Sequence, residues 1–193
     1  LGRVLVAVGA TDYAPRLEKL ERCYGELQGA VSGNTRYSGR TLGGCRLMTG
    51  TGRTSGKLLV CREARGLPEP MAVDAGGRYV WDRRFHIHIR TTGFKESARP
   101  RLAALGEGGW LEIIAQRPEF RSPAIPAPAR AALPAFFDEK GVLSVPHLGF
   151  RRPDKRPDKA GRDPDIAKIR FYPPNSLTKA GFFLRKEPDI LSL

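Results

Sequence analysis

Residues 84–89 read RFHIHI, and this alternation of apolar and polar side chains is typical of a half-buried β-strand. Phe85, Ile87 and Ile89 would face a core, while His86 and His88 would share the opposite side. Residues 79–81 form another apolar run, which leads into this strand through Asp82. The sequence therefore predicts β-structure at the centre of the chain.

Other short segments lie on both sides of this strand. Seven short apolar runs predict further strands, at 41–48, 57–62, 71–73, 135–137, 142–146, 171–177 and 180–184. A hairpin turn is expected at 138–141. Short helices are predicted at 101–105, ending at Gly106, and at 129–133, ending before Pro134.

The first thirty residues follow a helical period instead. Within residues 1–8 the apolar side chains recur at intervals of three and four, and Gly9 can end a helix there. A second helix is expected to begin near Pro15 and to end at Gly29. Its apolar stripe consists of Leu17, Leu20, Tyr24 and Leu27. Together these segments predict a helical hairpin.

The predicted fold class is α+β, with an N-terminal helical hairpin followed by a mainly antiparallel β domain with short helices. The expected domains are 1–35 and 36–193. Residues 151–165 contain the tetrapeptide RPDK twice, and their charge and proline content predict a mobile surface loop. The first residues read as the interior of a longer protein, so we expect the chain to be a fragment.

The chain is strongly basic, with 33 Lys and Arg against 20 Asp and Glu, a formal charge of +13 and a pI of about 10.2. A field of one sign favours an anionic partner, and nucleic acid is the most common one. No apolar run approaches the roughly 20 residues that cross a bilayer, so no membrane partner is expected. The three cysteines lack metal-site or redox spacing and fit a reducing cytosol.

The strongest local signal for a partner is the segment 36–65, where seven basic residues stand against Glu63 alone, a local charge of 7 − 1 = +6. Arginine forks suit phosphate oxygens, so we expect phosphate contacts among the arginines of this segment and of the later strands and helices. The candidates are Arg40, Arg46, Arg62, Arg65, Arg84 and Arg130. The competing interpretation, a solvated basic face without a partner, is about equally compatible with the composition.

No set of residues predicts catalysis. Gly56-Lys57 resembles the end of a phosphate-binding loop, but Thr51 and Leu58 occupy positions that need glycine and Ser/Thr. His86 and His88 could chelate a metal, although no carboxylate or cysteine stands near them at ligand spacing. We therefore expect no catalytic residue and no metal in this chain. Two alternatives stay open: a self-contained metal- or small-molecule-binding β domain that uses the His86/His88 face, and a soluble scaffold domain.

Several motifs, in order along nearly the whole chain, resemble the part that follows the catalytic domain in bacterial tRNA(Ile)-lysidine synthetases of the alphaproteobacterial type. The matching segments are YAPR at 13–16, TLGGC at 41–45, LLVCREAR at 58–65, WDRRF at 81–85, ALG at 104–106, GW at 109–110, RAALPA at 130–135, VPHLGF at 145–150, LT at 177–178 and AGF at 180–182. Arg83 stands where many members carry glycine, and the insertion at 151–165 is unusually long.

The resemblance implies that the parent protein is a cytoplasmic, ATP-dependent ligase that joins lysine to C2 of the wobble cytidine of tRNA(Ile). In that family ATP and Mg²⁺ are bound by an N-terminal loop domain, which this chain lacks, so the chain should hold no cofactor and be inactive alone. The remaining domains grip the tRNA and help to select it. The implied partner is therefore tRNA(Ile), with a homodimer left open.

Overall fold

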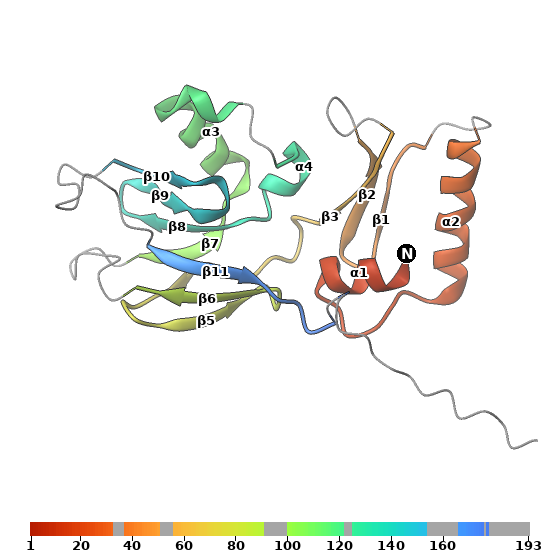
Figure 1. Ribbon diagram of the computed structural model, residues 1–193, viewed down its shortest axis with the longest axis horizontal. Helices are drawn as coiled ribbons and strands as arrows, with labels where there is room; N and C mark the ends of the chain where they lie inside the picture. Colours follow the sequence, from red (N-terminus) through yellow and green to blue (C-terminus); the bar gives the residue numbers. More distant parts are fainter. Residues whose placement is uncertain are drawn as a thin grey trace, which may run out of the picture.

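The computed structural model is an α+β fold in which two helices precede three antiparallel sheets, which confirms the predicted class (Figure 1). It describes residues 1–32, 37–50, 56–90, 100–121, 125–153, 166–175 and 177. Within these residues, no helix is both long and apolar enough to cross a bilayer. The predicted mobile loop at 151–165 lies mostly outside the described residues, as does the strand predicted at 180–184.

The first sheet shares its core with the two N-terminal helices. Helices α1 (Gly2–Gly9) and α2 (Leu17–Val31) lie where the helical period predicted them, and α2 continues past Gly29. The sheet has the order β1-β2-β3, with bounds Arg40–Leu42, Cys45–Thr49 and Leu58–Arg62. Leu5 of α1 and Cys23 of α2 are buried against Leu47 of β2. This core joins residues on both sides of the domain boundary predicted at residue 35.

The single strand predicted at 41–48 is in fact a tight hairpin. Gly43 and Gly44 form its turn between β1 and β2, and both have positive φ angles, of 59° and 70°. Such a two-residue turn needs residues that adopt this conformation without a steric cost, which glycine does. Helix α1 packs closely against this turn. A Cβ built on Gly9 would come within 1.9 Å of the carbonyl oxygen of Gly43, so only glycine fits at this position.

The second sheet has five strands in the order β10-β9-β8-β7-β4. Their bounds are Met71–Ala72 (β4), Arg101–Ala104 (β7), Pro134–Asp138 (β8), Gly141–Val145 (β9) and Phe150–Arg151 (β10). The hairpin predicted at 138–141 is confirmed. Helix α3 (Gly106–Gln116) and the short α4 (Ala127–Arg130) lie beside this sheet, and α3 places Ile113 in a core with Leu105 and Val142.

The helix predicted at 101–105 is wrong, because residues 101–104 form strand β7. Leu102 pairs with Met71 on one side and with Phe136 on the other, and its side chain is fully buried. Pairing on both sides outweighs the helical preference of a stretch rich in Ala and Leu. The helix instead begins at Gly106, the residue predicted to end it.

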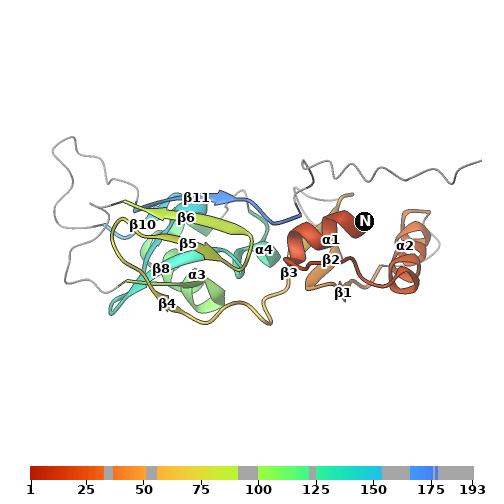
Figure 2. The same cartoon turned by 90° about the horizontal axis from the view of Figure 1, so that it is seen from below.

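The third sheet has the order β11-β6-β5, with bounds Ala167–Phe171, Phe85–Ile89 and Arg78–Trp81. Its inner face packs against the second sheet in a core that includes Trp81, Ile87, Ile89, Leu102 and Phe136. Figure 2 shows β5, β6 and β11 side by side, along the long axis of the molecule. A strand was predicted at 171–177, but β11 ends at Phe171, because Ala167–Phe171 is the segment that pairs with β6.

The turn between β5 and β6 holds two residues other than glycine in the left-handed backbone conformation. Asp82 and Arg83 have φ angles of 48° and 54°, which places both in the left-handed region. Aspartate tolerates this conformation, and glycine adopts it freely, whereas arginine does so at a steric cost. The side chain of Arg83 pairs with the carboxylate of Asp12 across to the N-terminal segment.

Candidate nucleic-acid interface

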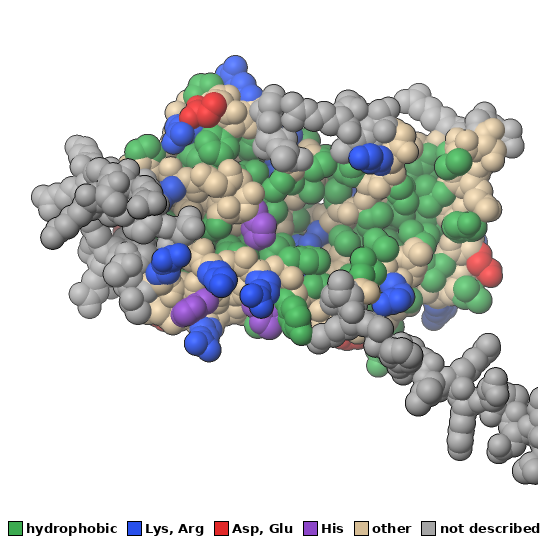
Figure 3. All heavy atoms as spheres, in the orientation of Figure 1, with side chains coloured by type: hydrophobic (Ala, Val, Ile, Leu, Met, Phe, Trp, Pro, Cys, Tyr) green, Lys and Arg blue, Asp and Glu red, His purple; other side chains and the backbone are tan. Residues whose placement is uncertain are grey.

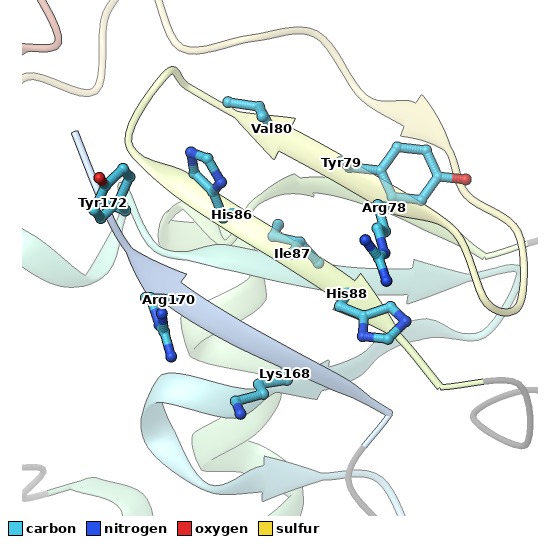
Figure 4. A pocket seen from close by; sticks show the side chains of 9 residues that line it. All are labelled: Arg78, Tyr79, Val80, His86, Ile87, His88, Lys168, Arg170 and Tyr172. Atoms are coloured by element: carbon cyan, nitrogen blue, oxygen red, sulfur yellow. The ribbon is translucent and has the colours of Figure 1, made fainter. Parts of the chain in front are cut away.

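The outer face of the third sheet is a basic and aromatic surface, which we call the basic sheet face. It surrounds a shallow concavity of about 540 Å³. Its outward side chains come from all three strands and from the residue just after β11 (Figure 4). They are Arg78, Val80, His86, His88, Lys168, Arg170 and Tyr172.

The strand register places these side chains in rows across the sheet. Arg78, His88 and Lys168 are directly opposite one another in the first row. Val80, His86 and Arg170 form the second row in the same way. The period of two that buries Ile87 and Ile89 forces both histidines outward, as RFHIHI predicted. Two residues along a strand separate the rows, a distance of about 6.8 Å.

Three cations of this face, Arg78, Lys168 and Arg170, lie together on one exposed sheet and form no ion pair with any described carboxylate. In the part of the chain that the structure describes, ion pairs join Arg22–Glu18, Arg40–Glu26, Arg62–Asp82, Arg83–Asp12, Arg84–Asp82, Arg117–Glu119 and Arg152–Asp138. None of the described residues that line the concavity is acidic. Figure 3 shows Lys and Arg side chains gathered beside histidine over this sheet, at the lower left.

Aromatic rings lie at one end of the basic sheet face. The ring of Tyr172 meets the ring of His86 edge-on, with 5.2 Å between the centroids and an interplanar angle of 79°. The backbone N–H of Tyr172 donates to the carbonyl oxygen of Arg84 at 2.7 Å, which holds this residue next to the sheet. Tyr172 remains 41% exposed and Val80 remains 58% exposed. The face therefore presents exposed ring surface next to cations that form no ion pair with a described carboxylate.

Two of the predicted phosphate contacts, Arg62 and Arg84, lie below the surface and bind a buried carboxylate. Asp82 accepts from Nε and Nη2 of Arg62, both at 3.1 Å, and from Nε of Arg84 at 2.7 Å. The side chains of the two arginines are only 10% and 6% exposed. Burial lowers the pKa of Arg84, and the Asp82 carboxylate opposes that shift. We therefore do not include these two arginines in the proposed interface.

Arg62 has a structural position instead. Its Nη1 donates to the carbonyl oxygens of Gly44 and Glu63, and its Nη2 donates to that of Gly66 as well as to Asp82. All five N–H groups of a guanidinium are thereby engaged. Because Gly44 belongs to the first sheet and Asp82 to the third, Arg62 ties these two sheets together.

The other four predicted arginines do not form one cluster with the basic sheet face. Arg40 pairs with Glu26 of α2 and is partly buried. Arg130 lies over the ring of Trp110, 4.0 Å from its centroid, and desolvation lowers the pKa of Arg130. Arg46 and Arg65 are exposed on or beside the first sheet. These two are the predicted candidates whose side chains face solvent.

The surroundings of His86 and His88 do not favour the alternative that these histidines bind a metal ion. His86 and His88 do share one face, as that alternative requires, but the neighbours across the strands are Val80, Arg78, Lys168 and Arg170. Flanking cations repel a divalent ion and offer it no ligand. Among the described residues, no three His, Cys, Asp or Glu side chains come together as a metal site. His147 packs edge-on against Phe85 at 5.2 Å, where burial and Arg84 lower the pKa of its imidazole.

Sequence reasoning missed the four residues that, with the histidines, give this face its character: Arg78, Lys168, Arg170 and Tyr172. A signal was present, because residues 166–171 read IAKIRF, with basic residues at every second position. What the sequence could not show is that this segment pairs with 85–89, some eighty residues earlier. Searches against protein families, curated proteins and solved structures found no match to this chain.

Proposed function

We propose that this chain is the tRNA-binding part of a tRNA(Ile)-lysidine synthetase and that the basic sheet face contacts the RNA. The observation that carries the RNA-binding proposal is the group of three cations, Arg78, Lys168 and Arg170, which lie together on one exposed sheet and form no ion pair with a described carboxylate. Cations that lack carboxylate partners can release counterions from phosphates without first breaking an internal ion pair. The motif resemblance at 41–45, 58–65, 81–85 and 145–150 supports tRNA(Ile) as the RNA.

In this proposal the ligase chemistry takes place elsewhere in a cytoplasmic parent protein. ATP and Mg²⁺ would be bound by the parent's N-terminal domain, while this chain would hold the tRNA body against it. The positive charge of the face suits contacts with RNA phosphates rather than the reading of base edges in an A-form groove.

Binding of the purified chain to a tRNA(Ile) transcript with a CAU anticodon, measured by filter binding at several salt concentrations, tests the proposal. We expect log K to fall with log salt by about 0.7–0.9 per phosphate contact. We also expect weaker binding to a tRNA for another amino acid. A flat salt response would refute the electrostatic interface, and equal affinity for both tRNAs would refute the assignment to tRNA(Ile).

A further inference from the structure

The basic sheet face is divided into a cationic end and an aromatic end. Its first row, with Arg78 and Lys168 on either side of His88, is cationic. Beyond the second row, Tyr172 adds a ring next to His86, and Val80 adds aliphatic surface. Arg170 lies between the two ends (Figure 4). A ligand that fills this face must therefore offer negative charge on one side and a flat apolar group on the other.

An RNA duplex could contact the cations of this face but not its aromatic rings. An A-form stem presents phosphates and 2′-hydroxyls, while its bases stay stacked inside the helix. The exposed rings of His86 and Tyr172 would then remain against water or sugar. An unpaired nucleotide can contact both, because its base can stack on an aromatic ring while its phosphates lie on nearby cations.

The spacing of the groups agrees with this ligand. Arg170 lies one row from Lys168 along β11, about 6.8 Å away, and Tyr172 lies a further two residues along the chain. The concavity is open and shallow, which allows a base to approach the rings from the side of the sheet. On the basis of the proposed RNA-binding function, we propose that this face binds an unpaired nucleotide segment, with a base stacked on Tyr172 beside the edge-on ring of His86 and with phosphates on Arg170, Arg78 and Lys168.

The test uses the full chain and two labelled probes, a single-stranded RNA of about eight nucleotides and a blunt RNA duplex. Stacking of one base on an aromatic side chain corresponds to roughly a tenfold change in affinity. We expect Tyr172→Ala to weaken single-strand binding about tenfold, and to leave duplex binding within about twofold of the wild type. Tyr172→Phe should retain single-strand binding, because phenylalanine keeps the ring.

Two controls make the result specific. Tyr24→Ala removes another half-exposed tyrosine, on α2, and should change neither affinity. A single strand with an abasic site at its centre should bind the wild type more weakly, and the loss should shrink in Tyr172→Ala. If Tyr172→Ala fails to fold, as judged by its thermal melting, His86→Ala replaces it, because the exposed His86 ring packs edge-on against the ring of Tyr172.

Equal losses for the single strand and the duplex, or no loss for either, would overturn the stacking assignment. This failure is distinct from failure of the proposed function. Salt-dependent tRNA binding that ignores Tyr172 would refute the stacking platform and leave the RNA interface standing. An absence of salt-dependent tRNA binding by the wild type would refute the interface itself.

Discussion

At the scale of single residues, Asp82 binds Arg62 and Arg84 and so holds both side chains below the surface. It is 7% exposed and accepts hydrogen bonds from both Arg62 and Arg84, so two positive charges share one carboxylate. Removing one partner from a buried charge network leaves the remaining charges unpaired, which costs about 3–5 kcal/mol. We expect Asp82→Asn to lower the free energy of unfolding by about 3 kcal/mol or more in urea denaturation.

Asp12→Asn is the matched control for this variant. Asp12 pairs with Arg83 in an exposed position, where water and salt screen the attraction, so we expect Asp12→Asn to change the free energy of unfolding little. Asparagine also tolerates the left-handed backbone that Asp82 adopts, so Asp82→Asn tests the charge rather than the turn. Similar, small effects of the two substitutions would show that the Asp82 network does not hold the sheets together.

Cys45 provides a pH-dependent readout of the first core. Burial raises the pKa of its thiol from 9.0 to about 11, and the thiol donates to the carbonyl oxygen of Leu5 at 3.4 Å. The folded chain therefore keeps a proton that the unfolded chain releases above pH 9. The protonated thiol of Cys45 makes its full contribution to the free energy of unfolding below pH 9, and this contribution is lost as the pH rises towards 11.

We expect the free energy of unfolding to fall between pH 9 and pH 11, and to fall less steeply in Cys45→Ala. The measurement is urea denaturation of both proteins at several pH values in this range. Burial also raises the pKa of Tyr37, to about 12, and that of Cys61, and both groups contribute with the same sign in both proteins, so the difference between the curves reports chiefly Cys45. Parallel curves would show that the thiol does not keep its proton in the folded state.

Residue identity alone could not separate buried arginines from surface arginines. Arg62 and Arg84 look the same in the sequence as Arg46 and Arg65, yet the first two are buried and the second two are exposed. The difference comes from Asp82, whose position in the turn before β6 brings it beneath β3. Burial of a charge depends on such a partner, and the partner is fixed only by the tertiary structure.

At the scale of elements, two helical glycines have opposite roles. A Cβ on Gly9 would come within 1.9 Å of the carbonyl oxygen of Gly43, so α1 could not lie against the β1–β2 turn. A Cβ on Gly25, in the middle of α2, would meet nothing within 4 Å. We expect Gly9→Ala to destabilise the chain by about 1–3 kcal/mol, and Gly25→Ala to stabilise it by about 0.5–1 kcal/mol.

Thermal and urea denaturation of these two variants measure both effects. Each replaces one glycine by alanine within a helix, so the helix-propensity gain is similar and the difference reports the contact with the turn. If both variants were equally stabilised, α1 would not pack on the β1–β2 turn as the structure has it.

The elements that the sequence predicted correctly are those with a strong local pattern. The period of two in 85–89, the turn at 138–141 and the helical stripes of α1 and α2 are all local. Strand β7 was mistaken for a helix because its pairing with β4 and β8 comes from residues far away in the chain. Strand β11 was displaced by several residues for the same reason, since only its register with β6 fixes its ends.

At the scale of the whole molecule, the excess of positive charge is unevenly compensated. The formal charge is +13, yet Arg22, Arg40, Arg62, Arg83 and Arg84 all have carboxylate partners. Of the segment 36–65, Arg40 and Arg62 are bound to carboxylates while Arg46 and Arg65 are exposed, and Arg78, Lys168 and Arg170 form a further basic group on the third sheet. Composition gives the total charge, whereas the sheet topology determines where unpaired charge is displayed.

The most direct measurement is the salt dependence of tRNA(Ile) binding by two triple variants with equal loss of charge. One variant carries Arg78→Ala, Lys168→Ala and Arg170→Ala on the basic sheet face, and the other carries Arg16→Ala, Lys19→Ala and Arg22→Ala at the exposed start of α2. We expect the first to weaken binding and to reduce the slope of log K against log salt by about 2–3, at roughly 0.7–0.9 per lost contact. The second should keep the slope of the wild type, and equal slopes in both variants would contradict an RNA interface on the basic sheet face.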